Sequence, residues 1–186
     1  MGEIAIPCRS QRLLLQLSRK TLENFVRGAP RDDENIADPY LQTSCYGAFV
    51  SLHSEDELRG CVGSCTPSKP LSEIVIEMTE AAAARDPRMT PVRPEELAAI
   101  KIDISILSPL ETAENPLALE VGRHGLYISR GRRRGVLLPQ VASEYSWDMQ
   151  TFLAHGCRKA GLKANAWRDS KTRVCSFTAL IIGEGR

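Results

Sequence analysis

One cysteine in this chain has neighbours that favour thiol chemistry. Residues 58–63 read Leu-Arg-Gly-Cys-Val-Gly, so Cys61 lies between Gly60 and Gly63 and two residues after Arg59. Glycines let a ligand approach the backbone closely, and a cation near a thiol favours the nucleophilic thiolate. The same pattern also fits a small buried cysteine near the end of a strand, because free cysteines are among the most buried residues.

The enzymatic interpretation gives each of these residues a role. Cys61 is the nucleophile, and Arg59 favours its thiolate or binds an anionic group of a small substrate. Gly60 and Gly63 leave backbone N–H groups accessible to a developing oxyanion. A general base must then come from elsewhere in the chain.

The strand register limits the choice of base. Residues 46–53 and 57–62 alternate apolar and polar side chains, which predicts a β-hairpin. We expect Leu52 to pair with Leu58, and Val50 with Gly60, with Val62 beside them on the core face. The opposite face then carries Phe49, Ser51, His53, Arg59 and Cys61.

In this register His53 lies about four strand steps, roughly 13 Å, from Cys61, which argues against a direct role as its base. His124, next to a glycine, is the better candidate. His155 lies within a predicted helix, where a packed or solvent-facing histidine is the more common case.

Two further clusters of cations have both functional and structural explanations. Arg85 and Arg88 flank an aspartate and a proline, and they would bind an anionic substrate or partner. Such a cluster is also typical of a solvated turn or a local ion pair. The tip of a second hairpin, residues 130–133 (Arg-Gly-Arg-Arg), is suited to phosphate, but without interleaved aromatic residues a solvated turn fits it better.

Composition narrows the class of protein. The 186 residues predict one domain, or a large lobe with a small one, and 42% apolar residues are ordinary for a globular protein. The net charge of +1 argues against a nucleic-acid partner. No apolar run reaches the ~18 residues of a membrane span. Residues 1–7 resemble neither a signal peptide nor a transit segment, which predicts a cytoplasmic protein.

The cysteine spacing predicts neither disulfides nor a metal site. The six cysteines are scattered, and in a reducing cytosol we expect mostly free thiols. Cys61 and Cys65 have the spacing that begins a radical-SAM cluster motif, but the third cysteine position is Ser68. No Cys-x2-Cys pair or histidine cluster supplies a zinc site. We therefore expect no metal and no cofactor.

Hydrophobic periodicity predicts helices and antiparallel strands without a βαβ rhythm, which favours an α+β fold. The remaining expected elements are helices at 10–26, 70–85 and 147–159 and strands at 101–107, 125–129, 134–138 and 174–182.

Six blocks, taken in order, resemble the AMME chromosomal-region protein family (the AMMECR domain). They are LRGCVG at 58–63, ARDPR at 84–88, HGL at 124–126, GVLLPQV at 135–141, WD at 147–148 and KAGL at 159–162. The blocks lie within residues 46–168, so we treat residues 1–186 as a single domain of this type. Val62 stands where isoleucine is usual and Gly156 where a larger apolar residue is common. Cys65 is not part of the pattern.

The resemblance implies an α+β fold with an antiparallel sheet and flanking helices, in a large lobe and a smaller lobe with a cleft between them. It also implies component A of the three-part AmmeMemoRadiSam system, with a Memo-like protein and a radical-SAM protein as partners. It implies no particular reaction.

Two classes of function therefore remain open. The first is a thiol-dependent enzyme acting on a small anionic substrate through Cys61. The second is a non-catalytic adaptor for a Memo-like or radical-SAM partner, with Arg59, Arg85 and Arg88 as anchors. In the adaptor, two tryptophans, Trp147 and Trp167, are candidate interface anchors or core residues.

Overall fold

The structure, a computed structural model, describes residues 4–31, 36–55 and 57–185. The chain divides into two compact units, which we describe separately. The large unit comprises Ala5–Pro109 and Leu180–Arg186, and Leu110–Ala179 form the body of the small unit. Each unit combines a β-sheet with helices, so the predicted α+β class is confirmed.

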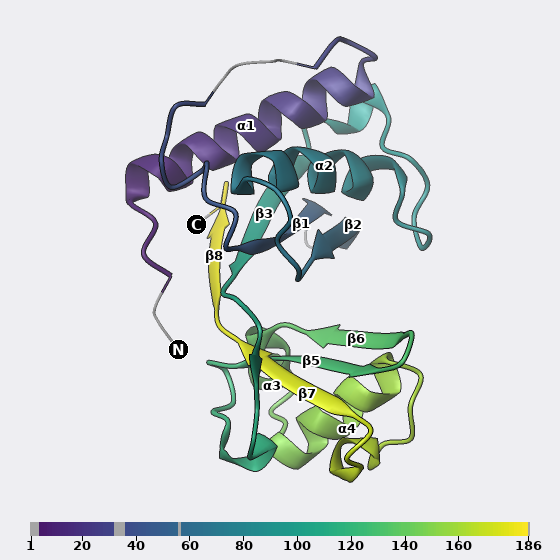
Figure 1. Cartoon of the computed structure of the whole chain (residues 1–186). Coiled ribbons are helices and arrows are strands. Elements are labelled where there is room, and N and C mark those ends of the chain that lie inside the picture. Colours follow the sequence, from purple (N-terminus) through teal and green to yellow (C-terminus); the bar gives the residue numbers. More distant parts are fainter. Residues whose placement is uncertain (1–3, 32–35, 56, 186) are drawn as a thin grey trace. The chain divides into compact units, whose positions relative to one another are not determined.

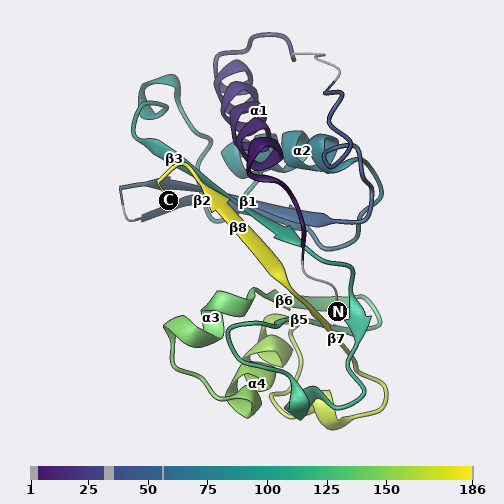
Figure 2. The same cartoon turned by 90° about the vertical axis from the view of Figure 1, so that its left-hand side faces the viewer.

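The large unit is a four-stranded sheet with two helices on one face (Figures 1 and 2). The strand order is β2-β1-β3-β8, and β1 pairs antiparallel with both of its neighbours. The elements are α1 (Cys8–Val26), β1 (Gly47–Ser54), β2 (Glu57–Ser64), α2 (Leu71–Ala84), β3 (Ile100–Leu107) and β8 (Ala179–Gly183).

The register of the β1–β2 hairpin differs by two residues from the predicted one. Val50 pairs with Val62 and Leu52 with Gly60, where we expected Val50 with Gly60 and Leu52 with Leu58. A shift of two residues keeps the same side chains on each face, because side chains alternate with a period of two. Val50 and Leu52 are therefore fully buried, as predicted.

A β-bulge explains where the predicted register fails. The pairing steps from Leu52–Gly60 to His53–Leu58, so Arg59 is an extra residue in β2. The bulge places Leu58 on the face of His53, opposite the core face. Leu58 is 36% exposed, so its assignment to the core was wrong.

Close packing of α2 on the hairpin requires a glycine. A Cβ atom at Gly60 would lie 2.2 Å from the carbonyl oxygen of Ala82 in α2. Only glycine leaves room for such an approach, and the helix in turn covers the core face of β1 and β2.

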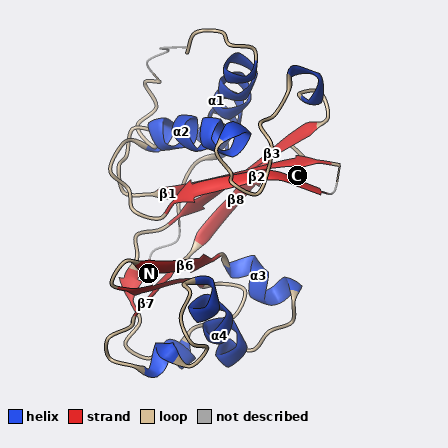
Figure 3. Ribbon diagram, turned by 90° about the vertical axis from the view of Figure 1, so that its right-hand side faces the viewer, coloured by secondary structure: helices blue, strands red, loops and turns tan. Residues whose placement is uncertain are grey.

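The small unit also contains a four-stranded sheet, with order β4-β7-β5-β6. Figure 3 shows the helices α3 and α4 of this unit together with β6 and β7. Its core contains Leu126 and Ile128 from the sheet and Phe152 and Leu153 from α4. The elements are β4 (Glu111–Thr112), β5 (Gly125–Arg130), β6 (Arg133–Leu137), α3 (Pro139–Glu144), α4 (Met149–Lys159) and β7 (Arg173–Phe177).

The end of the chain corrects one prediction. Residues 174–182 were expected to form a single strand, but β7 ends at Phe177 and β8 begins at Ala179. The two strands belong to different sheets, so the strand-like pattern of 174–182 did not show that the chain passes from one unit to the other. The short elements β4 and α3 were not predicted either. The hairpin turn expected at 54–56 includes residue 56, which lies outside the described residues.

We predict that Gly60→Ala lowers the free energy of unfolding by about 1–3 kcal/mol, because the new methyl group overpacks against the Ala82 carbonyl. Gly185→Ala is the matched control, since its Cβ would meet only Lys101 at 3.6 Å. Urea denaturation of both variants measures the difference. Equal midpoints would contradict the close approach of α2 to β2.

Candidate functional site

Cys61 lies in a row of polar residues on the face of the large sheet that α2 does not cover. Its backbone pairs with Ser51, and Ser51 pairs in turn with Asp103 on β3. The Ser51 hydroxyl donates a hydrogen bond to the Cys61 sulfur, with 3.2 Å between Oγ and Sγ. The thiol is half-buried and part of a polar network.

His53 extends this row along β1. Its Nε2 lies 3.7 Å from Oδ2 of Asp103, a distance that makes an ion pair when the imidazole is protonated. Because Cys61 pairs with Ser51, His53 is a diagonal neighbour of the thiol. Diagonal neighbours in antiparallel pairs are typically about 7–8 Å apart, closer than the roughly 13 Å expected from the sequence. His53 is therefore a candidate base for Cys61. We call Cys61, Ser51, His53 and Asp103 the thiol cluster.

A buried carboxylate fixes the backbone at the thiol. Asp86 follows the end of α2 and is 3% exposed. Its Oδ2 accepts the Cys61 backbone N–H at 2.9 Å, and its carboxylate also binds the Arg88 backbone and guanidinium. The Arg88 hydrogen bond holds the pKa of Asp86 well below its usual range, and the two backbone donors lower it further. The local ion pair predicted for 85–88 is confirmed.

Arg88 is the cation placed beside Cys61. Its Nη2 lies 3.4 Å from the Cys61 carbonyl oxygen, and its side chain is 58% exposed. The hydrogen bond to Asp86 raises the pKa of Arg88, and the charge of Asp86 raises it further. The Arg88 guanidinium can therefore contact the Cys61 backbone and, on its exposed side, a bound ligand.

Arg59 does not take the position expected of it. Its Nε donates to Glu96 Oε1 at 2.7 Å, and its other nitrogens donate to the carbonyl oxygens of Thr90 and Pro91. The guanidinium thus holds the 90–96 segment rather than facing the sulfur, because the bulge at Arg59 interrupts the alternation that predicted it. The same bond lowers the pKa of Glu96 from 4.5 to about 2.

The two glycines of the motif serve packing. Gly60 faces the core beneath α2, and a Cβ at Gly63 would lie 2.1 Å from the Phe49 ring. The N–H of Cys61 is already bound by Asp86. The Cys61 N–H is therefore not available to an oxyanion, and the role expected of the Gly60 and Gly63 N–H groups stays a prediction.

The remaining candidates lie outside the thiol cluster. His124 belongs to the small unit, is 7% exposed, and accepts the Glu120 N–H at Nδ1. Its role as a base for Cys61 stays a prediction. Arg85 is exposed and reaches the Glu77 carbonyl oxygen at 3.4 Å. His155 stacks on Trp147 with 3.9 Å between ring centroids, which confirms a packed histidine.

The other cysteines have different environments. Cys65, Cys157 and Cys175 are buried, and burial raises the pKa of Cys65 to about 12. Cys8 and Cys45 are exposed. Of the six cysteines, Cys61 is the one that is half-buried, and its sulfur accepts a hydrogen bond from Ser51.

Three contacts of the site were not predicted from the sequence. Strand alternation placed Ser51 on the same face as Cys61, but it could not predict the hydrogen bond from the Ser51 hydroxyl to the Cys61 sulfur. Asp103 stood on the polar side of its predicted strand without a known neighbour. The aspartate of the ARDPR block, Asp86, signalled an ion pair but not its bond to the motif.

The described part of the chain contains neither a candidate metal site nor a candidate membrane-spanning helix. There, no three His, Cys, Asp or Glu side chains are grouped in a way that could hold a metal ion. None of the helices described is both long and apolar enough to span a membrane.

Comparisons with known proteins give one consistent family. The AMMECR1 family model matches residues 15–182. A protein of Methanothermobacter thermautotrophicus is 41% identical, covering 93% of each chain, and Protein MK0488 of Methanopyrus kandleri is 38% identical, covering 99% of this chain and 92% of its own. The crystal structure of uncharacterized protein PH0010 from Pyrococcus horikoshii superposes with a TM-score of 0.89 at 36% identity, covering 96% of this chain and 93% of that one.

The Arg59–Glu96 pair predicts a loss of stability in acid. Because the pKa of Glu96 is depressed in the folded state, the unfolded chain takes up the proton first as the pH falls. The free energy of unfolding should therefore decrease between pH 4.5 and about 2. Glu96→Gln should flatten this dependence in urea titrations at stepped pH. Glu95→Gln, at an exposed neighbour, should follow the unmodified protein, and an identical slope in both variants would contradict the assignment.

Proposed function

This chain belongs to the AMMECR1 family, and from its own site we propose that it is a thiol-dependent enzyme acting on a small anionic substrate. The observation that carries the proposal is the hydrogen bond from Ser51 Oγ to Cys61 Sγ at 3.2 Å, on a polar face shared with His53 and Asp103. A nucleophile, a base candidate and an orienting carboxylate are the parts that thiol catalysis requires.

The base in this proposal is His53. Asp103 orients its imidazole, as the carboxylate of a catalytic triad does. The spacing of about 7–8 Å between diagonal neighbours leaves room for a substrate group or a water between His53 and the sulfur. His124 remains the alternative base.

The proposed reaction is a nucleophilic displacement. The sulfur of Cys61 forms a bond to an electrophilic carbon of the substrate, and the leaving group departs with its electron pair and the thiol proton, carried by His53. Water then cleaves the carbon–sulfur bond and restores the thiol proton. Arg88, with Arg85 beside it in the chain, binds the anionic group of the substrate, because its guanidinium is exposed next to Cys61.

The adaptor hypothesis uses the same surface differently. In it the chain is component A of the AmmeMemoRadiSam system, Arg85 and Arg88 contact a Memo-like or radical-SAM partner, and Cys61 is a packing residue. The reactivity of the thiol separates the two hypotheses.

We predict that iodoacetamide labels Cys61 faster than the other five cysteines near ~pH 6.5 in the native protein. Ser51→Ala and Arg88→Gln should each slow labelling several-fold, roughly 3–10-fold, because each removes an interaction beside the sulfur. Mass spectrometry after timed quenching gives the rate at each site.

Arg59→Leu is the matched control, because this guanidinium binds Glu96 rather than the sulfur. Its labelling rate at Cys61 should stay within about twofold of the unmodified protein. A Cys61 that is inert in the native protein but labelled after unfolding is a packed cysteine. That result would reject the enzyme and leave the adaptor hypothesis.

A further inference from the structure

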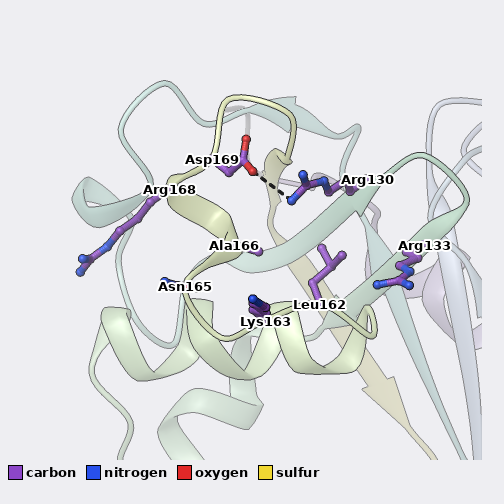
Figure 4. Close-up of a pocket in the computed structure, with 8 residues that line it drawn as sticks. All are labelled: Arg130, Arg133, Leu162, Lys163, Asn165, Ala166, Arg168 and Asp169. Carbon is purple, nitrogen blue, oxygen red and sulfur yellow. Dashed lines mark ion pairs between the residues drawn. The ribbon is translucent and has the colours of Figure 1, made fainter.

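The small unit contains an open cavity of about 780 Å³, and half of its lining residues are Arg or Lys. Its lining includes Arg130 and Arg133 at the ends of the β5 and β6 strands, and Lys163 and Arg168 from the segment after α4 (Figure 4). Asp169 is the one carboxylate among the lining residues. Two segments separated by about thirty positions in the sequence thus converge on one basic pocket.

Charge is concentrated in this part of the chain. Residues 110–179 contain 11 Lys and Arg against 6 Asp and Glu, although the whole chain has a net charge of only +1. The small net charge of the whole chain therefore does not reflect the surplus of positive charge in residues 110–179. Such a surplus raises the local concentration of anions.

Two of the arginines are held in place by the protein. Arg130 Nη1 lies 3.0 Å from Asp169 Oδ2, and Arg133 Nη1 donates to the Gly161 carbonyl oxygen at 2.8 Å. The hydrogen bond from the Lys171 backbone lowers the pKa of Asp169, and the Arg130 charge lowers it further. Each guanidinium keeps further N–H donors, and a fixed fork loses less entropy on binding an oxyanion.

Lys163 adds a third charge to the pocket. It is exposed, and no described residue forms an ion pair or side-chain hydrogen bond with it. Arg168, by contrast, lies over the Trp167 ring at 4.7 Å, and in Figure 4 its side chain extends away from the other cations. Arg130, Arg133 and Lys163 against Asp169 leave a surplus of two positive charges, which matches a phosphate monoester dianion.

We propose that this pocket binds the phosphate group of a small phosphate monoester. A volume of about 780 Å³ suits a compact metabolite rather than a polymer, and Asn165 offers an amide to a ligand hydroxyl. No aromatic side chain lines the pocket, so it lacks the stacking surface that single-stranded nucleic acids use. The proposal concerns the small unit alone and does not depend on Cys61 chemistry.

The test is an NMR titration of the ¹⁵N-labelled protein with inorganic phosphate and with ribose 5-phosphate. We expect saturable shifts confined to residues 130–133 and 161–169. Lys163→Gln should weaken binding of both probes about tenfold, because it removes an exposed charge without disturbing a structural contact. Ribose, which lacks the phosphate, should cause no shifts.

Arg132→Gln is the matched control, since Arg132 belongs to the same basic tip and is exposed but does not line the pocket. It should change affinity less than about twofold. Equal weakening by both variants, or shifts that never saturate, would show diffuse electrostatic attraction and overturn the proposal. An oligouridylate that binds more tightly than ribose 5-phosphate, with affinity rising with length, would overturn it in favour of a nucleic-acid surface.

Discussion

The arrangement around the thiol depends on one buried carboxylate. Asp86 is charged and almost inaccessible to water, a state that proteins tolerate only when the charge is paired and hydrogen-bonded. Arg88 supplies the pair, and the backbone of Cys61 supplies a further donor. Because β2 is the edge strand of its sheet, this bond also satisfies an N–H group that would otherwise face outward. The end of α2 and the thiol strand are thereby joined.

Periodicity predicted the elements of the fold better than their partners. The alternation at 101–107 identified a strand whose three isoleucines are fully buried. The faces of β1 were predicted correctly, but the register and the face of Leu58 were not, because pairing Leu52 with Leu58 also gives an apolar core. The close contact of Gly60 with Ala82, more than twenty residues away in the sequence, belongs to the packing of α2 on β2. A propensity rule contains no information on such a contact.

The candidate site was predicted in part. The sequence identified Cys61 and the ARDPR block as separate features, and the family resemblance placed both among its motifs. The hydrogen bond from the Cys61 N–H to Asp86 connects the two features. Because it is a tertiary interaction, neither spacing nor composition could predict it. The opposite error arose at Arg59, where regular alternation suggested proximity to the sulfur. One inserted residue was enough to send that side chain to Glu96.

The bulge at Arg59 also separates two parts of β2 that differ in their contacts. On the side of Cys61, the pairing of Gly60 with Leu52 is held by the helix above it. On the other side, Glu57 and Leu58 are exposed. Changes in the length of the connection between β1 and β2 can therefore be absorbed before the bulge, since a bulge already accommodates unequal residue numbers. We therefore expect a tag or label inserted in this connection to leave the pairing of Cys61 with Ser51 intact.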